Sequence, residues 1–283
     1  MNRPDRQMIC VVGVPGTGKT VMTDMIADAM IMHAGYDSVF VFDPLEQHSV
    51  PLERNIGDLQ AQIEYLEEDE ERVRKATSSG GRRAGMAARK LDGPLVRTVA
   101  EYEECCRLFA AERKSDKPSL IPPRVIWRCG PHGAAYAPAI AEACDTGNVV
   151  LVMSESRLWF PNYRHQWPIN EIPGRDDITM EHLITMGRAH IRNRAGDRCA
   201  LHMILDAQDF MMLSNLVRKN SDTVICGRLE GGEAFRIIQQ EFGDGTKTLV
   251  ERVRRLKNHE WIAVRSDPPG SMPELGPFRG GGR

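Results

Sequence analysis

The sequence predicts an α/β fold in which helices cover both faces of a mostly parallel sheet. Short apolar runs of strand length alternate along the chain with segments of helical periodicity, which is the pattern of parallel strands joined by crossover helices. Two of these runs, at 148–156 and 199–208, end in polar residues, and a third, at 38–42, is followed directly by Asp43. A glycine-rich turn follows another run, at 8–12. In such a sheet a ligand binds at the carboxyl edge of the strands.

The glycine-rich turn reads Gly13-Val14-Pro15-Gly16-Thr17-Gly18-Lys19-Thr20. This is G-x-x-x-x-G-K-T between a predicted strand and a predicted helix (21–33), which is the context of a phosphate-binding P-loop. Backbone N–H groups and the helix N-terminus would face the phosphates, Lys19 would add a positive charge, and the Thr20 hydroxyl would be a ligand for Mg²⁺. We expect these eight residues to bind nucleotide. The plain alternative is a tight turn followed by a surface lysine.

Composition and charge exclude several classes of protein. The chain is 41% hydrophobic and 27% charged, as in ordinary globular proteins. We expect no membrane span and no signal peptide, because no apolar run is long enough. Seven cysteines without C-x-x-C spacing disfavour a zinc site and suit the reducing cytoplasm. A net charge of −2 gives no overall attraction to nucleic acid.

The segment 148–156, NVVLVMSES, has the form of a Walker B strand. In that motif an acidic residue holds the water shell of Mg²⁺, and a following glutamate polarises the attacking water. Ser154 occupies the first position here and Glu155 the second. We expect Glu155 to be the general base, while Ser154 puts the strength of Mg²⁺ binding in question. Asp43 is either a further carboxylate near the ligand or a strand-ending turn residue.

The run 199–208, CALHMILDAQ, ends in Gln208. A glutamine at the carboxyl end of a strand beside a nucleotide can orient water or sense the γ-phosphate. Four arginines precede this run and suit either anion binding or a subunit contact. They are Arg188, Arg192, Arg194 and Arg198.

Two segments are candidate contacts to nucleic acid. Residues 46–93 contain an acidic run, a Gly/Ser break and a basic run, although an exposed charged loop explains them equally well. Residues 157–177 are a predicted long loop whose aromatic and basic residues suit either nucleic acid, a lid or a subunit interface. These residues are Trp159, Tyr163, Arg164, His165 and Trp167.

We expect residues 1–265 to form a single domain, in which 46–93 is a charged insertion or loop. The Pro/Gly-rich residues 266–283 are expected to be a flexible tail that orders only on a partner. The remaining expected elements are a strand and helix at 95–112, strands at 124–129, 221–229 and 260–265, and helices at 133–145, 178–192, 210–219, 232–241 and 246–257.

The chain resembles the HerA/FtsK superfamily of P-loop motor ATPases over about residues 8–230. Within this superfamily its compact size is most similar to that of the genome-packaging ATPases of membrane-containing icosahedral viruses. The segments that carry the resemblance are GVPGTGKT (13–20), VFVFDP (39–44), NVVLVMSE (148–155), ALHMILDAQ (200–208) and LVRKNSDTVICGRL (216–229).

The resemblance implies a RecA-like P-loop NTPase fold and an ATP-hydrolysing ring motor, commonly a hexamer, that translocates or packages double-stranded DNA. It implies that Lys19 and Thr20 bind phosphate and Mg²⁺, that Glu155 is the catalytic base and that Gln208 senses the γ-phosphate. A capsid or membrane-vertex protein would be a further partner, in the host cytoplasm or the virion.

Such a ring uses an arginine that reaches the neighbouring subunit's nucleotide, for which Arg188 is our first choice and Arg198 the second. Two departures from the family pattern, Ser154 for aspartate and Asp209 for arginine, would weaken hydrolysis. One alternative is an AAA-type remodelling ATPase, suggested by Pro15-Gly16-Thr17 but disfavoured by Gln208. The other is a nucleotide-binding assembly protein with little turnover, which Ser154 supports.

Overall fold

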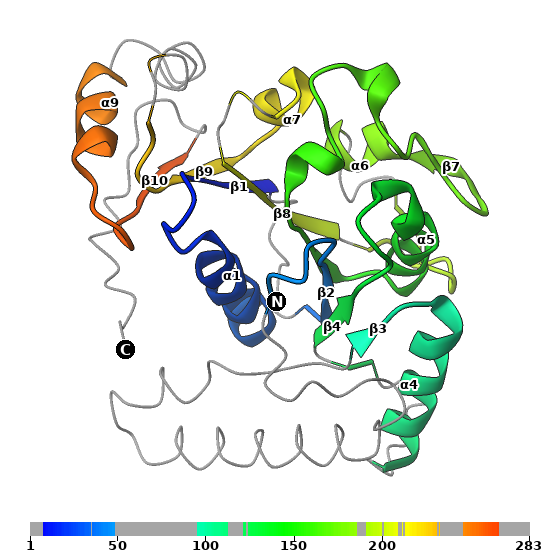
Figure 1. Cartoon of the computed structure of the whole chain (residues 1–283). Helices are drawn as coiled ribbons and strands as arrows, with labels where there is room; N and C mark the ends of the chain where they lie inside the picture. Colours follow the sequence, from blue (N-terminus) through cyan, green and yellow to red (C-terminus); the bar gives the residue numbers. More distant parts are fainter. Residues whose placement is uncertain are drawn as a thin grey trace, which may run out of the picture.

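The structure is a computed structural model (Figure 1). It describes residues 8–34, 36–48, 95–112, 121–122, 124–185, 191–199, 201–208, 211, 213–230, 232 and 246–265. Most of the charged segment 46–93, nearly all of the expected helix 232–241 and the tail 266–283 therefore lie outside the described residues.

An eight-stranded sheet forms the centre of the described chain, in the order β10-β9-β1-β8-β5-β2-β4-β3. All neighbouring strands are parallel except β9 and β10, which are antiparallel. The predicted mostly parallel sheet is thereby confirmed. In chain order the strands are β1 (Met8–Val12), β2 (Ser38–Phe42), β3 (Leu95–Val96), β4 (Arg124–Trp127), β5 (Val149–Met153), β8 (Leu201–Ala207), β9 (Thr223–Cys226) and β10 (Ile262–Arg265).

Helices cover both faces of this sheet (Figure 1). Helix α1 packs with the side chains of one face, and residues of the other described helices pack with those of the opposite face. The α-helices are α1 (Lys19–Ala34), α4 (Val99–Glu112), α5 (Ala137–Thr146), α6 (Met180–Thr185), α7 (Asn215–Lys219) and α9 (Thr246–Arg255). None of the described helices is long and apolar enough to cross a membrane.

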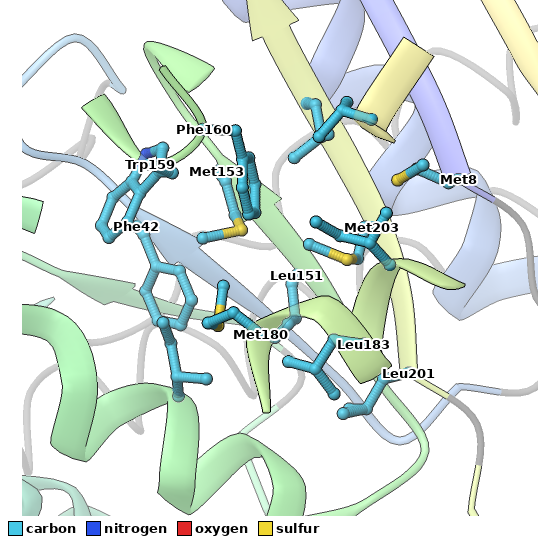
Figure 2. Close-up of a cluster of buried hydrophobic side chains, with 14 of the residues drawn as sticks. Met8, Phe42, Leu151, Met153, Trp159, Phe160, Met180, Leu183, Leu201 and Met203 are labelled. Atoms are coloured by element: carbon cyan, nitrogen blue, oxygen red, sulfur yellow. The ribbon is translucent and has the colours of Figure 1, made fainter. Parts of the chain in front are cut away.

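Alternation along the buried strands divides the core into two clusters. In β2, Val39 and Val41 join the cluster under α1, whereas Phe40 and Phe42 join the larger cluster on the opposite face. Successive side chains of a strand point to opposite faces, so a fully apolar strand is buried on both sides. Figure 2 shows part of the larger cluster, in which aromatic rings lie beside Met153 and Leu151 of β5.

The segment 157–177 is not the single long loop that the sequence predicted. It contains the 3₁₀ turns η3 (Ser156–Leu158) and η4 (Arg164–Gln166), strand β6 (Glu171–Ile172) and the start of strand β7 (Arg175–Thr179). Strands β6 and β7 form a separate antiparallel pair.

Trp159 and Trp167, expected as contacts to nucleic acid or to a lid or interface, are core residues instead. They are 2% and 5% exposed. Trp159 packs against Phe42 (Figure 2) and against Tyr136. Both rings belong to the core cluster on the face opposite α1, where Trp167 packs against Phe160. Tyr163 is 63% exposed, so this residue still presents an aromatic ring at the surface.

Other predicted boundaries differ by small amounts. The strands at 8–12 and 38–42 and the strand and helix within 95–112 are confirmed. The expected helix 178–192 is shorter, because residues 175–179 belong to β7 and Arg192 forms an antiparallel bridge with Arg198. The expected helix 133–145 begins as a 3₁₀ turn, and the α-helix within the expected helix 210–219 begins at Asn215.

Trp159→Ala should lower the free energy of unfolding by about 3–5 kcal/mol, because it leaves a cavity where a buried ring packs. Tyr163→Ala is the matched control and should change the free energy by less than about 0.5 kcal/mol. Urea unfolding followed by far-ultraviolet circular dichroism measures both. Equally small effects of the two substitutions would contradict the buried position of Trp159.

Candidate functional site

The P-loop, residues 13–20, joins β1 to α1 at the carboxyl edge of the sheet. Gly16 and Gly18 have φ of +80° and +88°, a region that side-chain-bearing residues rarely adopt. The buried Thr17 closes the turn, since its backbone N and its Oγ1 donate to the Val14 carbonyl at 3.3 and 2.8 Å. The two glycines and these two internal bonds together explain the tight shape of the loop.

The loop is also held by the strands on either side of β1. The Gly13 N–H donates to the Ala207 carbonyl of β8 at 3.2 Å, and the Val14 N–H donates to the Arg228 carbonyl after β9 at 3.0 Å. His259, in the turn before β10, lies against the loop from outside, because a Cβ at Gly18 would come within 2.8 Å of its Nδ1. Gly18 therefore leaves no room for a side chain.

Lys19 and Thr20 are the first two residues of α1. The Lys19 ammonium folds back over the loop and donates to the Gly13 carbonyl at 3.0 Å. Both side chains are half-buried. The N-terminus of α1, with its partial positive charge, therefore lies beside the lysine charge and the backbone N–H groups of the loop, an arrangement suited to an anion.

The neighbouring strands β8, β5 and β2 bring three polar side chains to the same edge of the sheet. Strand alternation places Asp206, Ser154 and Asp43 on the α1 face, each two residues beyond an apolar residue of the cluster under α1. All three are buried. Their partners differ, and this difference separates structural from functional candidates.

Ser154 belongs to a buried chain of hydrogen bonds. The His48 Nε2 lies 2.5 Å from the Ser154 Oγ, and the His48 Nδ1 lies 2.9 Å from the Asp24 Oδ1 of α1. Asp24 also pairs with Arg124 of β4. Serine, histidine and aspartate in this order resemble a hydrolase triad, but Ser154 and His48 are 0% and 1% exposed, so no substrate can reach the serine. This series of hydrogen bonds instead fixes α1 to β5 and β4.

The charge of Asp24 is balanced within this chain. Burial alone would raise the pKa of Asp24, but the hydrogen bond from His48 and the positive charge of Arg124 outweigh it and hold the pKa below its ordinary value. Asp24 is therefore ionised at neutral pH, and Arg124 provides the opposite charge.

Asp43 is used to form the turn that follows β2. Its carboxylate accepts the Gln47 and His48 N–H groups at 2.7 and 3.2 Å and the Arg128 Nε at 3.1 Å. Both oxygens are thus occupied within the protein. Of the two interpretations of Asp43, this geometry favours the strand-ending turn residue.

Glu155 directly follows β5 in an unusual backbone conformation. Its φ of +54° and ψ of +60° lie in the left-handed region, which costs a residue other than glycine of order 1 kcal/mol. Its backbone N–H donates to the Asp206 Oδ1 at 2.5 Å, and its Oε1 accepts from Gln47 Nε2 at 3.2 Å. Its half-buried side chain is held at the edge where the P-loop lies.

Among the described residues, Asp206 is a buried carboxylate that lacks a paired cation. It is 2% exposed, and no lysine, arginine or histidine among the described residues forms an ion pair with it. Burial raises the pKa of Asp206 to about 6, and the negative charge of Glu155 acts in the same direction. The pKa is lowered by the hydrogen bond from the Glu155 N–H and by the nearby His48 and Lys19, but these effects are smaller than the effect of burial.

The structure brings most of the candidate residues predicted from the sequence to one edge of the sheet. Gln208 is exposed directly after β8, next to the carbonyl that holds Gly13. Arg198 is exposed before the start of β8, at the opposite, amino edge of the sheet. Arg188, our first choice for an arginine acting between subunits, lies outside the described residues, as does Asp209.

Sequence reasoning missed two residues of the site, Asp206 and His48. Asp206 gave a signal, because an aspartate interrupts the apolar run 199–208 two residues before Gln208. His48 gave none, since it falls in a charged segment with no periodicity.

Asp206→Asn should stabilise the ligand-free protein at pH 8 more than at pH 5. A raised pKa in the folded state means that Asp206 favours folding at low pH and that this contribution is lost as pH rises through about 6. Asparagine keeps the acceptor for the Glu155 N–H but never ionises. The free energy of unfolding of the variant relative to wild type should rise by about 1–2 kcal/mol between the two pH values. Urea unfolding at both measures it, and a pH-independent difference would contradict the raised pKa.

Comparison with known proteins supports the fold. Neither a protein-family model nor a curated protein matches the chain. The genome packaging NTPase B204 from Sulfolobus turreted icosahedral virus 2, solved in complex with ATP-gammaS, is similar with a TM-score of 0.56 at 13% identity, over 98% of this chain and 99% of that chain. B204, the DNA-packaging ATPase from Sulfolobus Turreted Icosahedral Virus, gives 0.51 at 14% identity, over 95% and 96%. The chain thus has the RecA-like P-loop NTPase fold, and these two structural neighbours are viral genome-packaging ATPases, in line with the sequence resemblance.

Proposed function

We propose that this protein is a P-loop ATPase that hydrolyses ATP to translocate or package double-stranded DNA. The observation that carries the ATPase assignment is the juxtaposition at one sheet edge of the P-loop, Glu155 and Gln208. The loop suits a triphosphate, and the two side chains that follow β5 and β8 suit the reaction at its terminal phosphate.

In this proposal residues 13–20 bind the phosphates of ATP through backbone N–H groups. Lys19 leaves the Gly13 carbonyl, with which it pairs in the structure, and contacts the β- and γ-phosphates. The donor set fits Mg²⁺, because the Thr20 hydroxyl and carboxylate oxygens are the hard ligands that this ion prefers. When bound, Mg²⁺ neutralises charge on the phosphate oxygens.

Glu155 is the proposed general base. Its left-handed backbone and its bonds to Asp206 and Gln47 fix it before ATP arrives, so little reorganisation precedes proton removal from water. Gln208 is the proposed γ-phosphate sensor, because its exposed amide follows the strand that holds the P-loop. An amide is uncharged and can donate to a phosphate oxygen while it accepts from the attacking water.

We further propose a homo-oligomeric ring, commonly a hexamer in such motors, with nucleotide between subunits. Arg198 is exposed at the amino edge of the sheet, so it is better placed to serve a neighbouring subunit than the P-loop of its own chain. Arg188 stays the first candidate for this role. In this proposal double-stranded DNA passes through the central pore of the ring. The ring docks on a capsid or membrane-vertex protein, in the host cytoplasm or the virion.

Lys19→Ala and Glu155→Gln should each reduce steady-state ATP hydrolysis at least 100-fold, and double-stranded DNA should stimulate the wild type. The first substitution removes the charge on the phosphates and the second removes the base while keeping the side chain's shape. Lys219→Ala and Glu171→Gln are the matched controls, because both residues are exposed on other parts of the described surface. Phosphate release measures turnover.

Each alternative function predicts a different result. ATP binding without turnover would favour the nucleotide-binding assembly protein. Turnover that depends on Lys19 and Glu155 but ignores DNA would favour a remodelling ATPase. Turnover that survives both substitutions would contradict the assignment of the site.

A further inference from the structure

The Walker B strand of this chain lacks a carboxylate for the metal side of the site. Ser154 stands where that carboxylate is expected, and its Oγ lies 2.5 Å from His48 Nε2. The serine is fully buried, inside a chain of bonds that ends on Arg124. The hydroxyl is therefore already used to hold the fold.

Asp206 lies one strand away from Ser154, on the side of the P-loop. Strand β8 pairs with β1 on one side and with β5 on the other. Asp206 lies opposite Val11 of β1, and Leu205 lies opposite Met153 of β5, so the next residues, Asp206 and Ser154, are neighbours. The Asp206 side chain points to the α1 face, the face on which Lys19 and Thr20 begin their helix.

The charges around Asp206 favour a cation. A buried carboxylate is normally paired, and two nearby aspartates, Asp24 of α1 and the buried Asp43 after β2, each contact an arginine. Asp206 has no such partner among the described residues, and the carboxylate of Glu155 is close enough to repel it. A divalent ion held beside Thr20 would supply the opposite charge.

We propose that Asp206 replaces the missing Walker B aspartate, so that β8 rather than β5 supplies the carboxylate that holds the water shell of nucleotide-bound Mg²⁺. This inference rests on the proposed function, because the ion arrives with ATP. It also makes Asp206 a positioning residue for the base, since the same carboxylate accepts the Glu155 N–H. Ser154 would then be no obstacle to turnover.

The test compares binding of a non-hydrolysable ATP analogue in Mg²⁺ and in EDTA by isothermal titration calorimetry, on the full chain. In the wild type, Mg²⁺ should increase the affinity for the analogue at least 10-fold. In Asp206→Asn the increase should be less than 3-fold. Without Mg²⁺ the variant should bind as tightly as wild type or tighter, because a negative charge near the phosphates is removed. A merely structural defect would weaken binding in both conditions.

Two further variants keep the test specific. Ser154→Ala should retain the full Mg²⁺ effect, because its hydroxyl is assigned to His48 and not to the ion. Asp176→Asn, an exposed aspartate of β7, is the matched control for the loss of one carboxylate and should behave as wild type. Circular dichroism confirms that each variant is folded, and Asp206→Ala, which should show the same loss as Asp206→Asn, provides a second replacement.

Three results would overturn the inference. Asp206→Asn could retain the full Mg²⁺ effect, it could weaken binding equally with and without Mg²⁺, or Ser154→Ala could lose the effect while Asp206→Asn keeps it. If the wild type does not bind nucleotide, the proposed function itself is overturned, and this inference with it. That outcome differs from the three above because the wild type and all variants would then fail to bind the ATP analogue.

Discussion

The candidate site depends on the insertion of β8, in parallel, between β1 and β5. This pairing brings the Ala207 carbonyl to the Gly13 N–H and Asp206 to the Glu155 N–H, so one strand links the phosphate-binding loop to the proposed base. Parallel pairing also collects the carboxyl ends of the strands at one edge. Any shift of β8 by one residue would turn Asp206 to the opposite face and break both links.

Three aspartates in and next to the candidate site show how charge separates fold from function. Asp24 and Asp43 are neutralised by Arg124 and Arg128, and each fixes a helix or a turn. Asp206 keeps a charge that the described protein does not pair. Burying an unpaired charge lowers stability. The buried Asp206 carboxylate is best explained by a bound cation that offsets this cost, in keeping with the trade-off between stability and activity at functional sites.

Local sequence was enough to predict the elements that surround the P-loop, because they are defined by local signals. Strands 8–12 and 38–42 are short apolar runs that end at a glycine or at Asp-Pro, and Gln208 follows its strand as expected. What could not be predicted depends on contacts between distant segments. Trp159 is buried because Phe42 and Tyr136 lie beside it, and Asp206 matters because of strand order, which the periodicity of a single strand does not encode. The polar run 175–179 forms a strand only through its pairing with β6.

The most direct test of this account is a crystal structure of the protein with a non-hydrolysable ATP analogue and Mg²⁺. The account predicts the phosphates within the loop of residues 13–20, with Mg²⁺ between the Thr20 hydroxyl and a water shell held by Asp206, and Ser154 still bonded to His48. Nucleotide bound elsewhere would contradict the proposed function. Nucleotide in the loop with Mg²⁺ held by Ser154 or Asp43 instead would contradict the role given to Asp206.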